Sequence, residues 1–305
     1  MFFYVRKKYN YNKHVEANND AIAQRWDAFA IQVAYFVNNN VDVIILSLFS
    51  NIREVSVYTV YHMITQMLHN IMNSFCGSIG SAFGNMFALE ERDNIKKNIK
   101  LIEFIFFTSI TFLFVCGVKL IIPFVQLYTK GITDVSYYRP VFGIIICLNF
   151  YFLSVRMPYE ILIETVGHFK QMKVGAIIEM ILNIGVSIIL VIKYGLIGVG
   201  IGTLCASVFR TLQYTIYFYK NVLKIPIIGI LKNYSVSVIE ILVVLNVANF
   251  FNISNVSFLK LCFDAFILAI IVFIIVGFFS VFFYKTEIMM LTHKFKNFTC
   301  FKKGV

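Results

Sequence analysis

Polar side chains recur at helical spacing inside an otherwise lipid-soluble segment near the start of the chain. Gln32, Tyr35, Asn39 and Asp42 follow one another at intervals of 3, 4 and 3 residues, which places them on one face of an α-helix. The other faces of this segment carry mainly Val, Ile, Phe and Leu. A carboxyl group in the apolar interior of a membrane is costly, so it normally faces a bundle interior or a water-filled cavity. Asp42 is therefore our candidate for binding a proton or a cation.

A second segment has the same pattern of polar residues on one helical face. His62, Gln66, His69 and Asn73 are spaced by 4, 3 and 4 residues, again on one helical face. Each amide side chain, taken alone, is better explained by hydrogen bonding between helices. The two polar faces together favour a hydrated cavity between neighbouring helices.

Three charged residues lie within or beside later apolar segments. Arg210 is the last candidate for the cavity, and its guanidinium could pair with a carboxylate or extend to the cytoplasmic interface. Glu103 and Glu179 fall near the expected cytoplasmic ends of their segments, where long side chains reach the interface at little cost.

The composition decides which solvent these helices need. The chain has 305 residues, of which 59% are hydrophobic and 14% charged, and its mean hydropathy is +0.77. Because soluble domains carry about 25% charged residues, the sequence predicts an all-α, polytopic membrane helix bundle. A membrane-spanning helix needs roughly 20 apolar residues. That length predicts about eight transmembrane helices, at 28–49, 55–78, 98–119, 137–157, 174–192, 196–219, 234–251 and 261–284.

The expected spans divide the chain into three parts. Residues 1–27 form a basic cytoplasmic segment, 28–219 a six-helix transmembrane bundle, and 220–305 two further helices with a basic cytoplasmic tail. Prolines fall at or near expected span ends, where a lost helix hydrogen bond is cheapest. They are Pro123, Pro140, Pro158 and Pro226.

The basic residues are distributed unevenly between the two sides of the predicted bundle. Of the 27 Lys and Arg residues, 20 fall on the side of the N-terminus and six on the other. This positive-inside pattern predicts that both termini are cytoplasmic. It also accounts for the net charge of +11 without nucleic acid as a partner, and the same loops can contact anionic membrane lipids.

Several kinds of chemistry have no motif in this sequence. There is no GxxxxGK[ST] phosphate loop, no HExxH zinc motif, no GxSxG nucleophile elbow and no CxxC pair. His62 and His69 have no carboxylate or cysteine at metal-ligand spacing. We therefore expect no enzyme, no cofactor and no metal. The GxxxG pairs Gly80/Gly84 and Gly198/Gly202 predict close helix contacts rather than a ligand site.

Three segments carry a resemblance to a known family. They are VNNNVDVIILSLFSNIREVSVYTVYHMI (37–64), AFGNMFALEERD (82–93), and the region 161–223 with its strings GHFK and YGLIGVGIGT. These segments resemble the second half of polysaccharide flippases, which belong to the multidrug/oligosaccharidyl-lipid/polysaccharide exporter superfamily. Within that group, the third segment is similar to O-antigen and capsule repeat-unit flippases. The similarity covers residues 25–225.

The resemblance implies a fold, a substrate and a location. The fold would be the C-terminal half of a two-bundle (MATE-like) transporter, with the N-terminal bundle absent from this chain and possible on another chain. The substrate would be an undecaprenyl-pyrophosphate-linked oligosaccharide, such as an O-antigen, capsule or exopolysaccharide repeat unit. It would be flipped across the bacterial cytoplasmic (inner) membrane.

Other functions stay open at this point. A truncated chain could be a non-transporting remnant or an assembly partner. A lipid II flippase or a multidrug exporter of the same superfamily is a near alternative. An integral-membrane polysaccharide polymerase or transferase would need a sizeable outer loop, and the expected outer loops are short.

Overall fold

The computed structural model describes residues 23–89, 92–249 and 257–302, and these form helices joined by short connections. The helices are α2 (Arg25–Phe49), α3 (Ile52–Asn73), α4 (Cys76–Ala88), α5 (Arg92–Tyr128), α6 (Pro140–Thr165), α7 (Phe169–Tyr194), α8 (Leu196–Tyr217), the π-helix η2 (Phe218–Leu223), α9 (Ile228–Ala248), α10 (Phe258–Phe283) and α11 (Lys285–Lys302). No strand occurs among these residues, so the expected all-α class is confirmed.

Seven of the described helices are long and apolar enough to cross a membrane: α2, α5, α6, α7, α8 with η2, α9 and α10. The eighth expected span, 55–78, is different. Its helix α3 is 22 residues long, but its polar side chains lower its hydropathy. The helix ends at Asn73, before α4 begins at Cys76. Seven of the eight expected spans thus meet this criterion among the described residues, and the eighth, α3, is a more polar helix packed against α2, α5 and α6.

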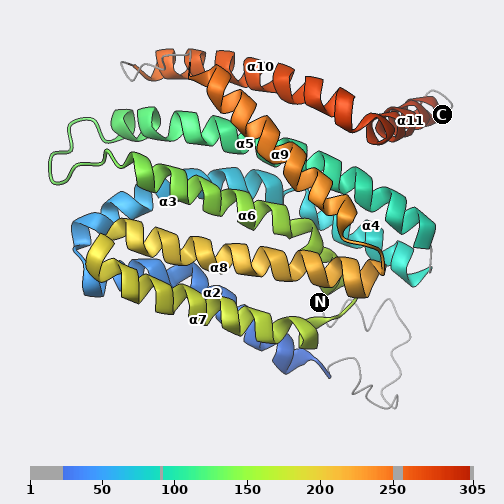
Figure 1. The fold of residues 1–305 in the computed structure, drawn as a ribbon, viewed down its shortest axis with the longest axis horizontal. Helices are drawn as coiled ribbons and strands as arrows, with labels where there is room; N and C mark the ends of the chain where they lie inside the picture. The colour runs from blue at the N-terminus through green and yellow to red at the C-terminus, as the bar shows by residue number, and fades with distance from the viewer. Residues whose placement is uncertain (1–22, 90–91, 250–256, 303–305) are drawn as a thin grey trace, which may run out of the picture.

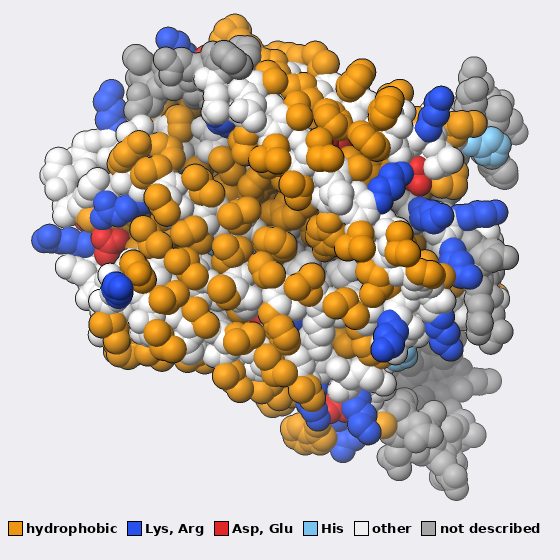
Figure 2. Space-filling view, viewed as in Figure 1, with side chains coloured by type: hydrophobic (Ala, Val, Ile, Leu, Met, Phe, Trp, Pro, Cys, Tyr) orange, Lys and Arg blue, Asp and Glu red, His pale blue; other side chains and the backbone are white. Residues whose placement is uncertain are grey.

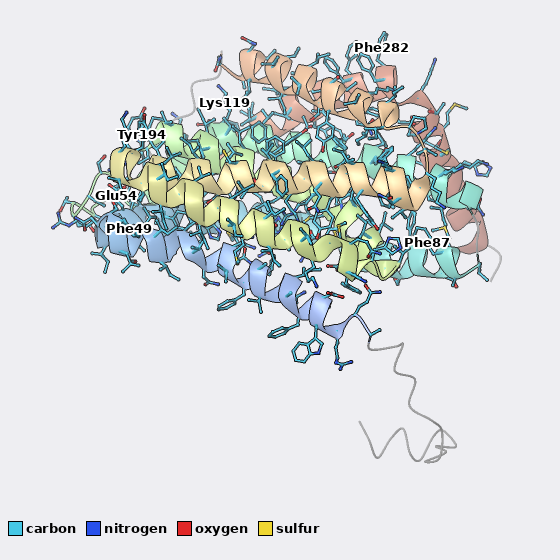
Figure 3. All side chains as sticks on the ribbon, turned by 60° about the horizontal axis from the view of Figure 1, so that its bottom comes forward. Phe49, Glu54, Phe87, Lys119, Tyr194 and Phe282 are labelled. Atoms are coloured by element: carbon cyan, nitrogen blue, oxygen red, sulfur yellow. The ribbon has the colours of Figure 1, made fainter. Side chains whose placement is uncertain are left out.

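The long helices lie side by side, with connections at the two ends (Figure 1). A broad apolar belt separates the basic side chains at one end from those at the other (Figure 2). Phe49, Glu54 and Tyr194 lie at one end of the bundle, and Phe87 lies at the opposite end (Figure 3). This arrangement is that of a multi-pass membrane protein.

Glycine allows α7 and α8 to fold back on each other at close range. Gly195 joins the two helices with a φ of +54°, a left-handed conformation that side chains disfavour. A Cβ at Gly198 would lie 2.4 Å from the Leu190 carbonyl group, and one at Gly202 would lie 2.1 Å from Ser187 Oγ. Gly80 and Gly84 similarly face Ile161 and Thr165 of α6 at 3.0 and 3.2 Å. Both GxxxG pairs therefore mark helix contacts, as the sequence predicted.

The Gly198→Ala variant is expected to be less stable than the parent protein. The added methyl meets backbone atoms of Leu190, which cannot rotate away, so overpacking should cost about 1–3 kcal/mol of unfolding free energy. Gly185→Ala, on α7 with nothing within 4 Å of its Cβ, is the matched control and should be neutral or slightly stabilising. Thermal unfolding in detergent measures both, and equal midpoints would contradict the close contact.

Helix α6 extends further than the sequence indicated. Pro140 occupies its first turn as expected, but Pro158 lies inside the helix, which continues to Thr165 rather than ending at 157. Pro123 likewise lies within α5. Neighbouring helices in a bundle can compensate for the backbone group that proline leaves free. As a result, the charged residues that follow Arg156 stay on a helix inside the bundle.

The expected division into 1–27, 28–219 and 220–305 stays a prediction, and most of its first part lies outside the described residues. Among the later helices, α9 and α10 pack on α5, and α10 leads into α11.

Candidate functional site

A cavity of about 480 Å³ opens between α2, α3, α6, α7 and α8. Eight of the nine residues predicted for a cavity line it: Gln32, Tyr35, Asn39, Asp42, His62, Gln66, His69 and Asn73. The two polar faces therefore meet in space. Their functional role stays a prediction.

The cavity passes from an open side to a buried wall. Gln32, Tyr35 and Asn39 on α2 are exposed, as are Gln66 and Asn73 on α3. Asp42, one turn beyond Asn39, is only 3% exposed. A ligand entering from the open side thus meets amides and a phenol first and reaches the carboxylate last.

Asp42 joins three helices through one carboxylate oxygen. Its Oδ2 accepts hydrogen bonds from Tyr58 Oη of α3 at 2.9 Å and from Thr203 Oγ1 of α8 at 2.7 Å. Its Oδ1 is buried and has no hydrogen-bond partner within the part of the chain that the structure describes. A buried acceptor without a partner is costly, so a further ligand bound to this oxygen would be stabilised.

A small hydrogen-bond network surrounds Thr203. Its single hydroxyl hydrogen lies within reach of Asp42 Oδ2, of Asn183 Oδ1 at 3.3 Å and of the Val199 carbonyl oxygen at 3.1 Å. Ser187 Oγ is shared in the same way between Asn183 Oδ1 at 3.2 Å and the Val199 carbonyl oxygen at 3.4 Å. Because a hydroxyl donates once, Thr203 and Ser187 each alternate between these acceptors, while Tyr58 also donates to Asp42 Oδ2.

The histidines lie in a different part of the cavity wall. The His62 ring stacks on Tyr58 with 5.4 Å between centroids, and His69 Nδ1 is buried without a partner in the described chain. Across the described residues, no group of three or more His, Cys, Asp and Glu could hold a metal ion. The cavity lining combines hydrogen-bonding and charged side chains with apolar ones such as Phe150 and Leu153.

One cation of the cavity wall was not among the predicted cavity residues. Arg156, near the end of the expected span 137–157, lines the cavity on α6. Its Nη1 donates to Glu179 Oε1 at 2.6 Å, and its Nε lies 3.6 Å from Glu160 Oε2. The signal was available as a third polar face, in which Asn149, Arg156, Glu160 and Glu164 are spaced by 7, 4 and 4 residues.

Arg210 is the one predicted residue that does not line the cavity. It is 1% exposed, and its Nε lies 3.4 Å from Glu179 Oε2. The same guanidinium donates to the Met172 carbonyl oxygen, Gln213 and Tyr214 at 2.6–3.0 Å. Of the two environments considered for Arg210, pairing with a carboxylate is therefore the one observed. All these partners hold the side chain behind the cavity wall.

The two glutamates expected near an interface are buried as well. Glu179 bridges Arg156 and Arg210. Glu103 is 3% exposed and accepts hydrogen bonds from Tyr159, Tyr219 and Asn233. Both carboxylates have partners inside the bundle. The prediction that they extend to the interface is therefore wrong.

The comparisons with known proteins address the fold. No protein-family model matches the chain, and no curated protein matches its sequence. Among solved structures, the chain is similar to the lipid II flippase MurJ in its inward closed conformation, with a TM-score of 0.63 and 19% sequence identity. The fold is MurJ-like. The match covers 93% of this chain and 59% of that chain, so this chain spans about three fifths of the flippase's length.

Proposed function

We propose that this chain takes part in flipping a lipid-linked oligosaccharide across the bacterial cytoplasmic membrane, with both of its termini in the cytoplasm. The observation that carries the proposal is a polar cavity of about 480 Å³ within a bundle of apolar, MurJ-like helices. Amide and hydroxyl groups along its walls match the hydroxyl-rich surface of a sugar. The lipid tail would remain in the bilayer, against the apolar outer surface of the surrounding helices.

Arg156 supplies the cation that a pyrophosphate linkage requires. An arginine binds phosphate oxygens through two parallel N–H groups. In this structure, Arg156 faces the cavity beside Glu160 and Glu179. We infer that an arriving pyrophosphate replaces one of these carboxylates as its partner.

Asp42 is the proposed coupling residue. The chain carries no nucleotide-binding motif, so an ion gradient is the drive that the cavity can use. The unpartnered, buried Oδ1 of Asp42 favours a proton or a small cation at this position.

The open side of the cavity favours a second helical body facing it. Gln32, Asn39 and Gln66 are exposed at membrane depth, where bare amides are costly against lipid. A second bundle opposite α2 and α3 would complete an alternating-access arrangement. If no such body joins this chain, a role as a non-transporting assembly partner fits better.

The substrate can be resolved by a reconstitution experiment. The purified chain is placed in proteoliposomes with either an undecaprenyl-pyrophosphate-linked repeat unit or lipid II, the lipid in the structural neighbour's name. A membrane-impermeant reagent then reports the fraction of each lipid that reaches the outer leaflet. We expect faster flipping than in protein-free vesicles for one substrate. Asn39→Leu, inside the cavity, should slow it, whereas Ser47→Ala, outside the cavity, should not. No protein-dependent flipping of either substrate would favour the assembly partner.

A further inference from the structure

A second buried acid lies outside the cavity, where α9 crosses α5 (Figure 1). Glu240 is on α9, within a helix that is apolar enough to span a membrane, and is 2% exposed. Its Oε1 has no hydrogen-bond partner, and no ion pair involves its carboxyl group, among the residues that the structure describes. Glu179 and Glu103, by contrast, are fully engaged.

Glu240 ends a polar stripe along the buried face of α9. Asn233, Ser237 and Glu240 are buried there and are spaced by 4 and 3 residues. Asn233 donates to Glu103 of α5 at 3.2 Å. Ser237 Oγ lies 2.5 Å from Thr111 Oγ1 of α5 and accepts from Tyr151 Oη of α6 at 2.9 Å. The stripe therefore connects the carboxyl of Glu103, through amide and hydroxyl groups, to the helical turn that carries Glu240.

The charged groups of the surrounding helices are occupied elsewhere or lie toward helix ends. On α5, Lys119 donates to Asn249; on α9, Lys232 donates to the Phe283 carbonyl oxygen at 2.7 Å. Other titratable groups on these neighbours include Lys100 and Glu103 of α5, Tyr151 of α6, Tyr234 of α9, Lys260 and Asp264 of α10, and Tyr284 after α10. Of these, Tyr151 and Tyr284 lie within electrostatic range of the Glu240 carboxyl. None of them is a cation that balances it.

We propose that Glu240 is a proton-binding site in the interface between α9 and α5, separate from the cavity. An ionised carboxylate without a partner in an apolar medium costs far more than the neutral acid. A metal cation would need several oxygen ligands at once, whereas Glu240 Oε1 has no hydrogen-bond partner in the described chain. One proton bound to the carboxylate removes the charge and needs no further ligand. This inference is independent of the proposed flipping activity.

Infrared difference spectra of the protein in vesicles, recorded across steps of pH, provide the test. The wild type should show a protonated-carboxyl C=O band that Glu240→Gln loses, and added Na⁺ at constant pH should leave that band unchanged. Glutamine has the shape of the neutral acid, so the variant should unfold at the wild-type temperature. The same substitution at Glu179, which pairs with two arginines, should remove no such band.

A second measurement uses only the wild-type chain, so it does not depend on the folding of a variant. A membrane-permeant carbodiimide reacts with protonated carboxyls, and peptide mass spectrometry locates the product. We expect modification at Glu240 and none at Glu179. An unchanged band in Glu240→Gln, a band abolished by Na⁺, or modification of Glu179 at least equal to that of Glu240 would each overturn the proposal.

Discussion

Replacing Glu179 with glutamine is expected to lower the free energy of unfolding by about 3–5 kcal/mol, because it leaves buried cations without their counter-charge. Glu179 is 8% exposed and holds Arg156 at 2.6 Å through one oxygen and Arg210 at 3.4 Å through the other. Glutamine keeps the shape of the side chain but carries no charge. After the exchange, Glu160 is the only carboxylate seen near Arg156, at 3.6 Å in the described structure.

A matched variant distinguishes the cost of breaking a buried ion pair from the cost of breaking an exposed one. Glu54 pairs with Arg139 at 2.9 Å, but the two side chains are 22% and 31% exposed. Solvent screens such a pair, so Glu54→Gln should cost no more than about 1 kcal/mol. Thermal unfolding of both variants in detergent measures the difference. Equal shifts in the two midpoints would show that the cluster around Glu179 is not a buried charge network.

The cavity walls on α2 and α3 could be predicted from the sequence because local spacing determines them. A polar residue on every third or fourth position of an apolar segment marks one helical face. The two helices are consecutive and are joined only by Ser50 and Asn51, so they must be antiparallel neighbours. Asn51 caps α3 by accepting from the Arg53 N–H, which fixes the turn. Periodicity and a short connection thus suffice to place two polar faces together.

The opposite wall was missed because its spacing continues past the expected end of a helix. Ending the span at 157, beside Pro158, left Glu160 and Glu164 outside the helix and hid the polar face of α6. The helix continues because a transmembrane bundle tolerates an internal proline. Spacing also does not reveal which distant helix a side chain will meet. Glu179 pairs with arginines 23 and 31 positions away in the sequence, and only the fold brings them together.

The Asp42→Asn variant is expected to lower transport roughly tenfold or more while leaving the fold intact. Asparagine fits the same space, and its carbonyl can still accept from Tyr58 and Thr203. It cannot carry the negative charge that binds a proton or a cation. Hydrogen bonds to a charged group are worth about 1.5–3 kcal/mol, and about 1.4 kcal/mol is a factor of ten in an equilibrium constant. The loss of this one charge therefore accounts for a change of that size in ion binding.

Flipping in proteoliposomes with an imposed ion gradient measures this effect, and unfolding temperature reports whether the variant has folded. Thr203→Ser is the matched control, because it keeps the hydroxyl that donates to Asp42 Oδ2 and should keep most of the activity. The decisive comparison is the response to the gradient. Asp42→Asn should flip at one rate with or without it, whereas the wild type and Thr203→Ser should flip faster with it. A gradient response retained in Asp42→Asn would assign coupling to another residue and leave Asp42 as a structural link between α2, α3 and α8.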